Sequence, residues 1–330
     1  MIGLLLIFLL IVALLSFRIF YENHTFVMRY YEVEKKMGSQ DEGGWKIVFL
    51  SDLHNKEYGS GNQRLLGAIR REAPDLILVG GDMLIRSTGE KSEHAAAFLE
   101  RLPAIAPVYC ANGNHEQKMK ECEETYGEAY RKYRKRLADS GIHMLENEAD
   151  TIWIRGQRMQ IGGLEIPVSF FTKQFPWKHH ETYREESPEK QMPGQFDLRP
   201  VSEGGPYKIL LAHQALYAET YAGWGMDLVL CGHLHGGVVR LPGIGGVISP
   251  QLTLFPKYSG EHSRFRDCDI IVSKGLGGHS IPIRLFNLRK TGGSGIIKRL
   301  QDAKRKRKSN GYTGKASGVR GASRAAPTPD

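Results

Sequence analysis

Five short motifs along the sequence carry the side chains that most readily bind a divalent metal. In chain order they are Asp52-Leu53-His54, Gly81-Asp82, Gly113-Asn114-His115-Glu116, His213 and Gly232-His233-Leu234-His235. Besides His115 and Glu116, they supply two aspartates, one asparagine and four histidines, a mixed nitrogen and oxygen ligand set without a thiol, which suits hard and borderline divalent cations. The set predicts a metal site, in which the glycines let the backbone approach whatever is bound.

Each motif has a plainer explanation when it is taken alone. An aspartate or histidine after a strand is more often a helix cap or a turn residue than a ligand. Asn55 and His279 are weaker candidates for substrate contact, because a turn explains either. His233 and His235 would point to the same side of an extended backbone, yet they need not share one metal. The recurrence of such residues at five places is what favours function.

The motifs follow short apolar runs that have the composition of buried strands. The runs are rich in β-branched residues, are bounded by Gly, Pro, Asp or Asn, and span residues 45–50, 75–80, 106–111, 207–212, 227–232 and 269–273. Helices are predicted at residues 62–72, 93–102 and 121–141. The alternation predicts an α/β sandwich around a substantial sheet, and such folds place their sites at the carboxyl ends of strands.

The order of the motifs resembles that of the calcineurin-like metallophosphoesterases. The resemblance covers about residues 45–290, and "GHLHGGVVRLPGIGG" and "VSKGLGGHSIPIRLF" are similar to the membrane-associated bacterial branch related to YkuE and YaeI. It implies a four-layer α/β/β/α sandwich preceded by one transmembrane helix.

The resemblance also implies a role for each motif residue. One metal would be held by Asp52, His54 and His235, a second by Asn114, His213 and His233, and Asp82 would bridge them. The metals would be Mn, Fe or Zn, and two of them about 3.5–4 Å apart clamp the attacking and leaving oxygens of a phosphoryl transfer. A metal-bridging hydroxide would attack. His115 matches the family's non-ligand histidine, which would donate a proton to the leaving group or orient the substrate.

The expected function is hydrolysis of a phosphodiester or pyrophosphate. A lipid-linked or nucleotide-sugar phosphate is the expected substrate class, since some members of the wider family cleave the pyrophosphate of UDP-diacylglucosamine. The alternative is a metal-stabilised, non-enzymatic protein that binds membrane or an anionic polymer. A nuclease would need a basic groove in the body of the chain. The charges of the body nearly balance, so nucleic acid is not the favoured partner.

The N-terminus has the composition of a membrane anchor. Residues 2–17 carry no charge, and residues 19–21 extend the apolar stretch past Arg18, so the segment is long enough to span a bilayer as a helix. A cleaved signal peptide is disfavoured because the basic start and the small-residue cleavage site are missing. Arg18, Arg29, Lys35 and Lys36 follow the span and no Lys or Arg precedes it, which favours a cytoplasmic catalytic domain.

The net charge of +9 belongs to the C-terminal tail rather than to the body. From Lys298 onward there are ten Lys or Arg and two Asp, which leaves 35 positive and 34 negative side chains before it. The polar, basic composition predicts disorder. The tail is a solvated, solubilising segment or a clamp on anionic lipid. A nucleic-acid arm is the third and last-ranked option, because no aromatic residues are interleaved with the basic ones.

The complete organisation predicted from the sequence has four parts. They are a transmembrane anchor at residues 1–21, a linker at 22–44, a metallophosphoesterase domain at 45–296, and a basic disordered tail at 297–330. Residues 170–206 lack a clean period and are predicted to be a flap beside the site or a mobile insertion. The four cysteines form no CxxC pair, so no disulfide framework is expected.

Overall fold

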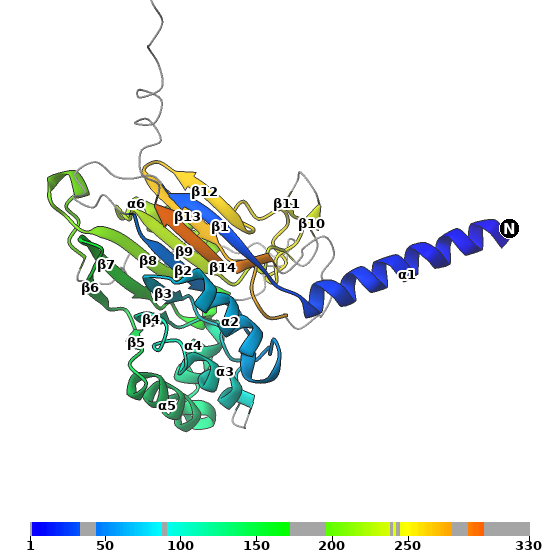
Figure 1. The fold of residues 1–330 in the computed structure, drawn as a ribbon, viewed down its shortest axis with the longest axis horizontal. Helices are drawn as coiled ribbons and strands as arrows, with labels where there is room; N and C mark the ends of the chain where they lie inside the picture. The colour runs from blue at the N-terminus through cyan, green and yellow to red at the C-terminus, as the bar shows by residue number, and fades with distance from the viewer. Residues whose placement is uncertain are drawn as a thin grey trace, which may run out of the picture.

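Two six-stranded sheets form the centre of the molecule (Figure 1). The structure, a computed structural model, describes residues 2–33, 44–87, 91–171, 196–237, 240–241, 245–278 and 290–299. The first sheet runs in the order β1 (Val27–Val33), β14 (Lys290–Arg299), β2 (Lys46–Leu50), β3 (Leu76–Val79), β4 (Val108–Ala111) and β5 (His143–Leu145). The second runs β12 (Glu261–Phe265), β13 (Cys268–Val272), β9 (Leu228–Gly232), β8 (Tyr207–Gln214), β7 (Gln157–Leu164) and β6 (Ala149–Ile154).

Helices and short turns connect these strands. The α-helices are α1 (Ile2–His24), α2 (Gln63–Glu72), α3 (Lys91–Leu99), α4 (Asn114–Glu121), α5 (Glu123–Asp139) and α6 (Ala218–Gly223). Single 3₁₀ turns occur at η1 (Ser60–Asn62), η2 (Val168–Phe171), η5 (Val201–Glu203) and η6 (Ala215–Tyr217). A small antiparallel pair, β10 (Arg240–Leu241) and β11 (Gly245–Gly246), lies outside the two sheets.

All six predicted strands are confirmed, as β2, β3, β4, β8, β9 and β13. The predicted helices correspond to α2, α3 and α5. Helix α4 was not predicted separately, because its sequence NHEQKMKE has no apolar period to signal a helix. The four cysteines are free, as expected, and three of them are buried.

Three apolar cores separate four layers, which confirms the α/β/β/α sandwich. Alternate residues of a strand point to opposite faces of its sheet, so Val48 packs under the helices while Phe49 faces the other sheet. In β8, Leu211 faces the first sheet and Leu210 faces α6. Figure 1 shows α2 to α5 together on one side of the strands. Burying a side chain of this size contributes roughly 1.5–3 kcal/mol.

The strand directions decide where the site can form. β2, β3, β4 and β5 are mutually parallel, and β7, β8, β9 and β13 are parallel in the second sheet. Strands that run parallel end at the same edge of a sheet. The segments that follow β2, β3 and β4 therefore emerge together, and so do those that follow β8 and β9.

Helix α1 extends away from the sandwich (Figure 1). It has 23 residues and its most apolar window is not buried, so it is long and apolar enough to cross a membrane. Residues 27–33, within the segment expected to be a linker, form β1 and pair with β14, which itself runs past residue 296. The division into anchor, linker, catalytic domain and tail stays a prediction, and residues 300–330 of the tail lie outside the described part of the chain.

The core between the sheets makes a testable prediction about stability. Leu78→Ala should lower the free energy of unfolding by about 2–5 kcal/mol, because it leaves a cavity between two close-packed sheets. Leu198→Ala, at a leucine that is 52% exposed, is the matched control and should change it by less than about 0.5 kcal/mol. Urea unfolding followed by circular dichroism measures both. Equal losses in the two variants would contradict the assignment of this core.

Candidate metal centre

The carboxyl ends of strands from both sheets bring the motif residues into one place. Seven of the predicted residues lie together there, and all but Asn114 are buried: Asp52, His54, Asp82, Asn114, His213, His233 and His235. The sheets approach so closely at this edge that a Cβ on Gly232 would overlap the Ser51 hydroxyl. The glycine before His233 is therefore required by the contact between the two sheets.

The first group of ligand atoms comes from Asp52, His54 and His235. The Nε2 atoms of His54 and His235 are 3.0 Å apart, and their rings are stacked with centroids 5.0 Å apart. The Oδ1 atom of Asp52 lies 3.5 Å from Nε2 of His235 and 4.0 Å from Nε2 of His54. Two imidazole nitrogens and a carboxylate oxygen thus face one small volume, as ligands of a divalent cation do.

A second group comes from Asp82, His213 and His233. Nε2 of His213 lies 3.3 Å from Oδ2 of Asp82. Asn114 joins this group from the start of α4, because its Oδ1 atom lies 2.7 Å from Nδ1 of His233. His233 and His235 therefore face different groups, although only one residue separates them.

Asp82 lies between the two groups. Its Oδ2 atom is 3.3 Å from Nε2 of His213 and 3.7 Å from Nε2 of His54, so one carboxylate oxygen faces a histidine of each group. Its other oxygen accepts a hydrogen bond of 2.8 Å from the backbone N–H of His115. The position suits a carboxylate shared by two cations.

The charges of the buried groups favour a bound cation. Burial disfavours the charged form of Asp82, but the neighbouring His213 and His115 outweigh it and hold its pKa well below the usual range. Burial likewise disfavours a charged His213, yet Asp82 and Asp52 raise its pKa to about 10. Burial, reinforced by the Asp82 charge, raises the pKa of Asp52. Two carboxylates in one buried site thus attract positive charge strongly.

The residues present fit a divalent metal. Nε2 of His213 is buried and makes no hydrogen bond of ordinary geometry, whereas its Nδ1 atom is 2.7 Å from the carbonyl oxygen of Gly80. A carbonyl partner on one ring nitrogen makes the other the free electron-pair donor, which is the usual arrangement of a metal-binding histidine. The donor set of imidazole, carboxylate and amide oxygen is also that of a divalent cation site.

The backbone around the centre is held in an unusual conformation. Six non-glycine residues here have positive φ, in the left-handed region: Asp52, His54, Asn55, Asp82, His233 and His235. Such a conformation costs about 1–2 kcal/mol for a residue with a Cβ. Strain of this kind is concentrated at functional sites, and five of these six residues, all but Asn55, belong to the groups of ligand atoms.

Glu116 stabilises the backbone next to the centre, a role that sequence reasoning missed. Its buried carboxylate accepts hydrogen bonds from the backbone N–H groups of Asp82, Met83, Leu84 and Gly113. Burial raises its pKa to about 7. It thereby ties the loop after β3 to the start of α4. The one available signal was its spacing, three residues after the helix-capping Gly113.

The remaining predicted site residues lie around this centre. The half-buried His115 ring is 5.1 Å from the His54 ring, and its Nδ1 atom accepts the backbone N–H of Arg86. Asn55 donates its backbone N–H to the carbonyl of Met83, and its Oδ1 atom is buried without a hydrogen-bond partner. His279 lies outside the described residues.

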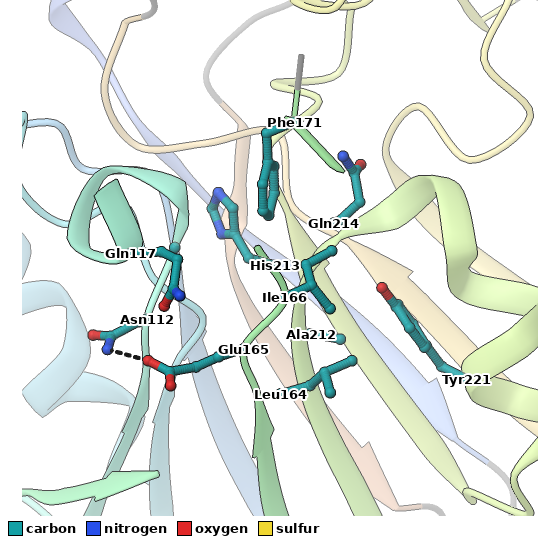
Figure 2. A pocket seen from close by; sticks show the side chains of 11 residues that line it. Asn112, Gln117, Leu164, Glu165, Ile166, Phe171, Ala212, His213, Gln214 and Tyr221 are labelled. Atoms are coloured by element: carbon teal, nitrogen blue, oxygen red, sulfur yellow. Dashed lines mark hydrogen bonds between the residues drawn. The ribbon is translucent and has the colours of Figure 1, made fainter. Parts of the chain in front are cut away.

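A small cavity adjoins the second group of ligands, as Figure 2 shows. His213 and Asn112 both line it, and Asn112 donates a hydrogen bond of 2.7 Å to Glu165. Phe171 covers the histidines, with its ring 4.9 Å from that of His233 and 6.1 Å from that of His213. Sequence reasoning missed these lining residues. Phe171 begins the predicted flap, whose residues 172–195 lie outside the described chain.

The fold and the clustered ligands define a metal-dependent phosphoesterase. Residues 46–237 match the family model of the calcineurin-like phosphoesterases, so the chain belongs to that family. It is therefore a hydrolase that acts on phosphate esters, and the family uses divalent metals. This outcome favours the enzyme over the non-enzymatic binding protein.

Known proteins are similar over most of the chain. Phosphodiesterase YaeI of Escherichia coli strain K12 is 26% identical over 238 residues, which cover 71% of this chain and 75% of YaeI. YkuE of Bacillus subtilis strain 168, an uncharacterized metallophosphoesterase, is 25% identical over 251 residues, 74% of this chain and 76% of YkuE. The phosphopantetheinyl hydrolase PptH from Mycobacterium tuberculosis has a TM-score of 0.42 at 11% identity, over 71% of this chain and 91% of PptH. The resemblance to YaeI and YkuE predicted from the motifs is confirmed.

Two glycines provide a matched test of how tightly the centre is built. Both have left-handed backbones, but a Cβ on Gly81 would overlap the backbone of Gly113, whereas nothing lies within 4 Å of one on Gly156. Gly156→Ala should cost about 1 kcal/mol of unfolding free energy from its conformation alone. Gly81→Ala should cost roughly 2–4 kcal/mol, because the loops carrying Asp82 and Asn114 must separate.

Urea unfolding and metal content by inductively coupled plasma mass spectrometry measure the two effects. Gly81→Ala should also lower the metal content, and Gly156→Ala should not. Identical behaviour of the two variants would show that the contact between the loops is not needed.

Proposed function

We propose that the chain is a two-metal phosphohydrolase that cleaves a phosphodiester or a pyrophosphate. The observation that carries this proposal is the sharing of Asp82 between two buried ligand groups, with one of its oxygens facing a histidine of each. A site for one metal would not need a second group of ligand side chains so close to the first. Two cations that share a carboxylate are the arrangement used to activate a phosphate for in-line displacement.

The proposed roles follow the grouping of the side chains. Asp52, His54 and His235 would hold one cation, Asn114, His213 and His233 would hold the other, and Asp82 would be shared between them. When bound, the cations supply a water of lowered pKa and withdraw charge from the phosphate oxygens. Mn, Fe and Zn are the candidates.

The residues around the cations have supporting roles. The neutral amide of Asn114 limits the negative charge of the site and so keeps it attractive to a phosphate. His115 lies within ligand distance of His54 and Asp82, but its half-buried ring is assigned here to the substrate rather than to either cation. From there it donates a proton to the departing oxygen or holds the substrate by a hydrogen bond. Asn55 and His279 are proposed as secondary substrate contacts.

The proposed substrate is an amphiphile that carries a phosphodiester or pyrophosphate. Two observations support this choice: α1 has the length and composition of a membrane anchor, and the related YaeI is named a phosphodiesterase. An anchored active site meets lipid-linked substrates at high local concentration, so a lipid-linked phosphate is favoured, and a nucleotide-sugar phosphate is the other candidate. The domain is proposed to face the cytoplasm, where the basic tail binds anionic lipid.

Hydrolysis of bis-p-nitrophenyl phosphate tests the reaction. The full chain in detergent should release p-nitrophenolate when Mn²⁺, Fe²⁺ or Zn²⁺ is added, and removal of the metal with a chelator should abolish the release. Absorbance of the product measures the rate. A folded protein with metal bound that turns over no diester with any of these cations would refute the proposed enzyme.

Replacement of the shared carboxylate tests the two-metal arrangement. Asp82→Asn should lose at least one bound metal per chain and lower kcat/KM by roughly a hundredfold or more, because the amide carries no charge to balance two cations. The matched control is Asp139→Asn, which alters an exposed carboxylate on α5 that is paired with Lys135. If Asp82→Asn keeps the activity and the metal content of the parent protein, the proposed bridging role of Asp82 is wrong.

A further inference from the structure

Three large apolar side chains are exposed in the segment that follows the last histidine motif. Leu241, Leu254 and Phe255 are 40%, 54% and 60% exposed. Backbone pairing brings them into one small unit. Leu241 pairs with Gly245 across β10 and β11, and Leu254 forms an isolated antiparallel β-bridge with Ile248. The N–H of Phe255 donates to the carbonyl of Val247. Residues 245–248 thus make backbone contacts with Leu241, Leu254 and Phe255. These three side chains are called the apolar loop surface below.

The apolar loop surface is attached closely to the metal centre. β11 packs on the glycines that follow His235, since a Cβ on Gly246 would come within 2.9 Å of the Gly236 carbonyl oxygen. The Arg240 guanidinium donates to that same carbonyl at 3.3 Å. A displacement of β10 and β11 would therefore move the backbone beside a proposed ligand.

A second attachment runs through two buried glutamines. Gln251, in the turn before Leu254, accepts a hydrogen bond of 3.1 Å from Gln214, the residue directly after His213. Both glutamine side chains also donate to the carbonyl of Phe170. These bonds connect the turn to the strand end that carries His213 and to the start of the segment that bears Phe171.

The β10–β11 pair, to which the apolar loop surface is joined by backbone contacts, lies on the side of the sandwich from which α1 extends. Figure 1 shows β10 and β11 at that flank of the sandwich, with α1 extending beyond it along the long axis. Helix α1 is the proposed bilayer span. Apolar side chains on the side of a domain from which a membrane helix extends are adjacent to lipid when the helix is inserted. Burial in lipid then lowers their free energy, whereas in water they stay exposed.

We propose that Leu241, Leu254 and Phe255 dock into the surface of the bilayer that α1 spans, at the boundary between headgroups and acyl chains. This inference rests on the anchoring part of the proposed function. A single membrane helix does not fix the orientation of the catalytic domain relative to the bilayer. A second contact fixes its orientation, because the helix already holds the surface at a high effective concentration beside the bilayer.

The docking specifies how the site meets its substrate. Because the apolar loop surface is attached to the strand ends of both His213 and His235, docking places the metal centre next to the headgroup layer. The phosphate of an amphiphilic substrate then reaches the ligands while its acyl chains stay in the membrane. The inference thereby favours a substrate that remains in the bilayer over a soluble nucleotide sugar.

Quenching of added tryptophans by brominated lipid tests the docking. The full chain is reconstituted in vesicles of phosphatidylcholine and phosphatidylglycerol, with and without bromine on the acyl chains. The emission added by Phe255→Trp, relative to the parent protein, should be lost in the brominated vesicles. Leu254→Trp is the second variant, in case the first folds poorly. Leu198→Trp is the matched control, because this exposed leucine lies with Lys208 and Asp227 at the opposite ends of the second-sheet strands, and its added emission should persist.

Two companion measurements separate the inference from the proposed function. Leu10→Trp reports insertion of α1, and release of p-nitrophenolate from the diester reports the enzyme. Quenching at position 10 with none at positions 254 and 255, in folded and active protein, would overturn the docking while leaving the anchor and the activity intact. Absence of quenching at position 10 would also overturn the docking, since it would remove the membrane on which the docking depends.

Discussion

The carboxylates of Asp52 and Asp82, buried together at 0% and 2% exposure, are the constraint on which the rest of the structure depends. An ion taken out of water costs several kcal/mol unless it is paired and hydrogen-bonded. The hydroxyl of Ser51 and the backbone N–H of His233 therefore donate to Asp52, and the backbone N–H of His115 donates to Asp82. These donors are neutral, so the negative charge of the two carboxylates has to be balanced by histidines or by bound cations.

This requirement explains why both sheets are needed. Asp52 and Asp82 come from the first sheet, whereas the N–H group of His233 and the ring of His213 come from the second. The side chains meet because each sheet runs its central strands parallel and ends them at the same edge. Glu116 then joins the loop after β3 to α4 through four backbone N–H groups. The apolar cores hold the sheets in register, and the polar contacts at their edge make the site.

Patterns along the chain were enough to predict the six central strands and the residues that gather beside them. Each of these strands contains three or more consecutive apolar residues that are buried, which is a local signal. The outer strands could not be recognised in this way. β6, for example, is partly exposed, and β1 and β14 join residues 27–33 to residues 290–299. Glu116 and Gln251 are ordinary polar residues in the sequence, and their importance arises from partners that lie far away along the chain.

Ligand type and position at a strand end were enough to predict which side chains gather at the candidate centre, because parallel strands convert these local properties into proximity. How these side chains divide into two groups depends on the tertiary structure. His233 and His235 would point to one side of an extended strand, but both adopt left-handed backbones. His233 consequently faces Asn114, and His235 faces His54. That division depends on loops from both sheets meeting around two buried charges, a condition that no stretch of sequence contains.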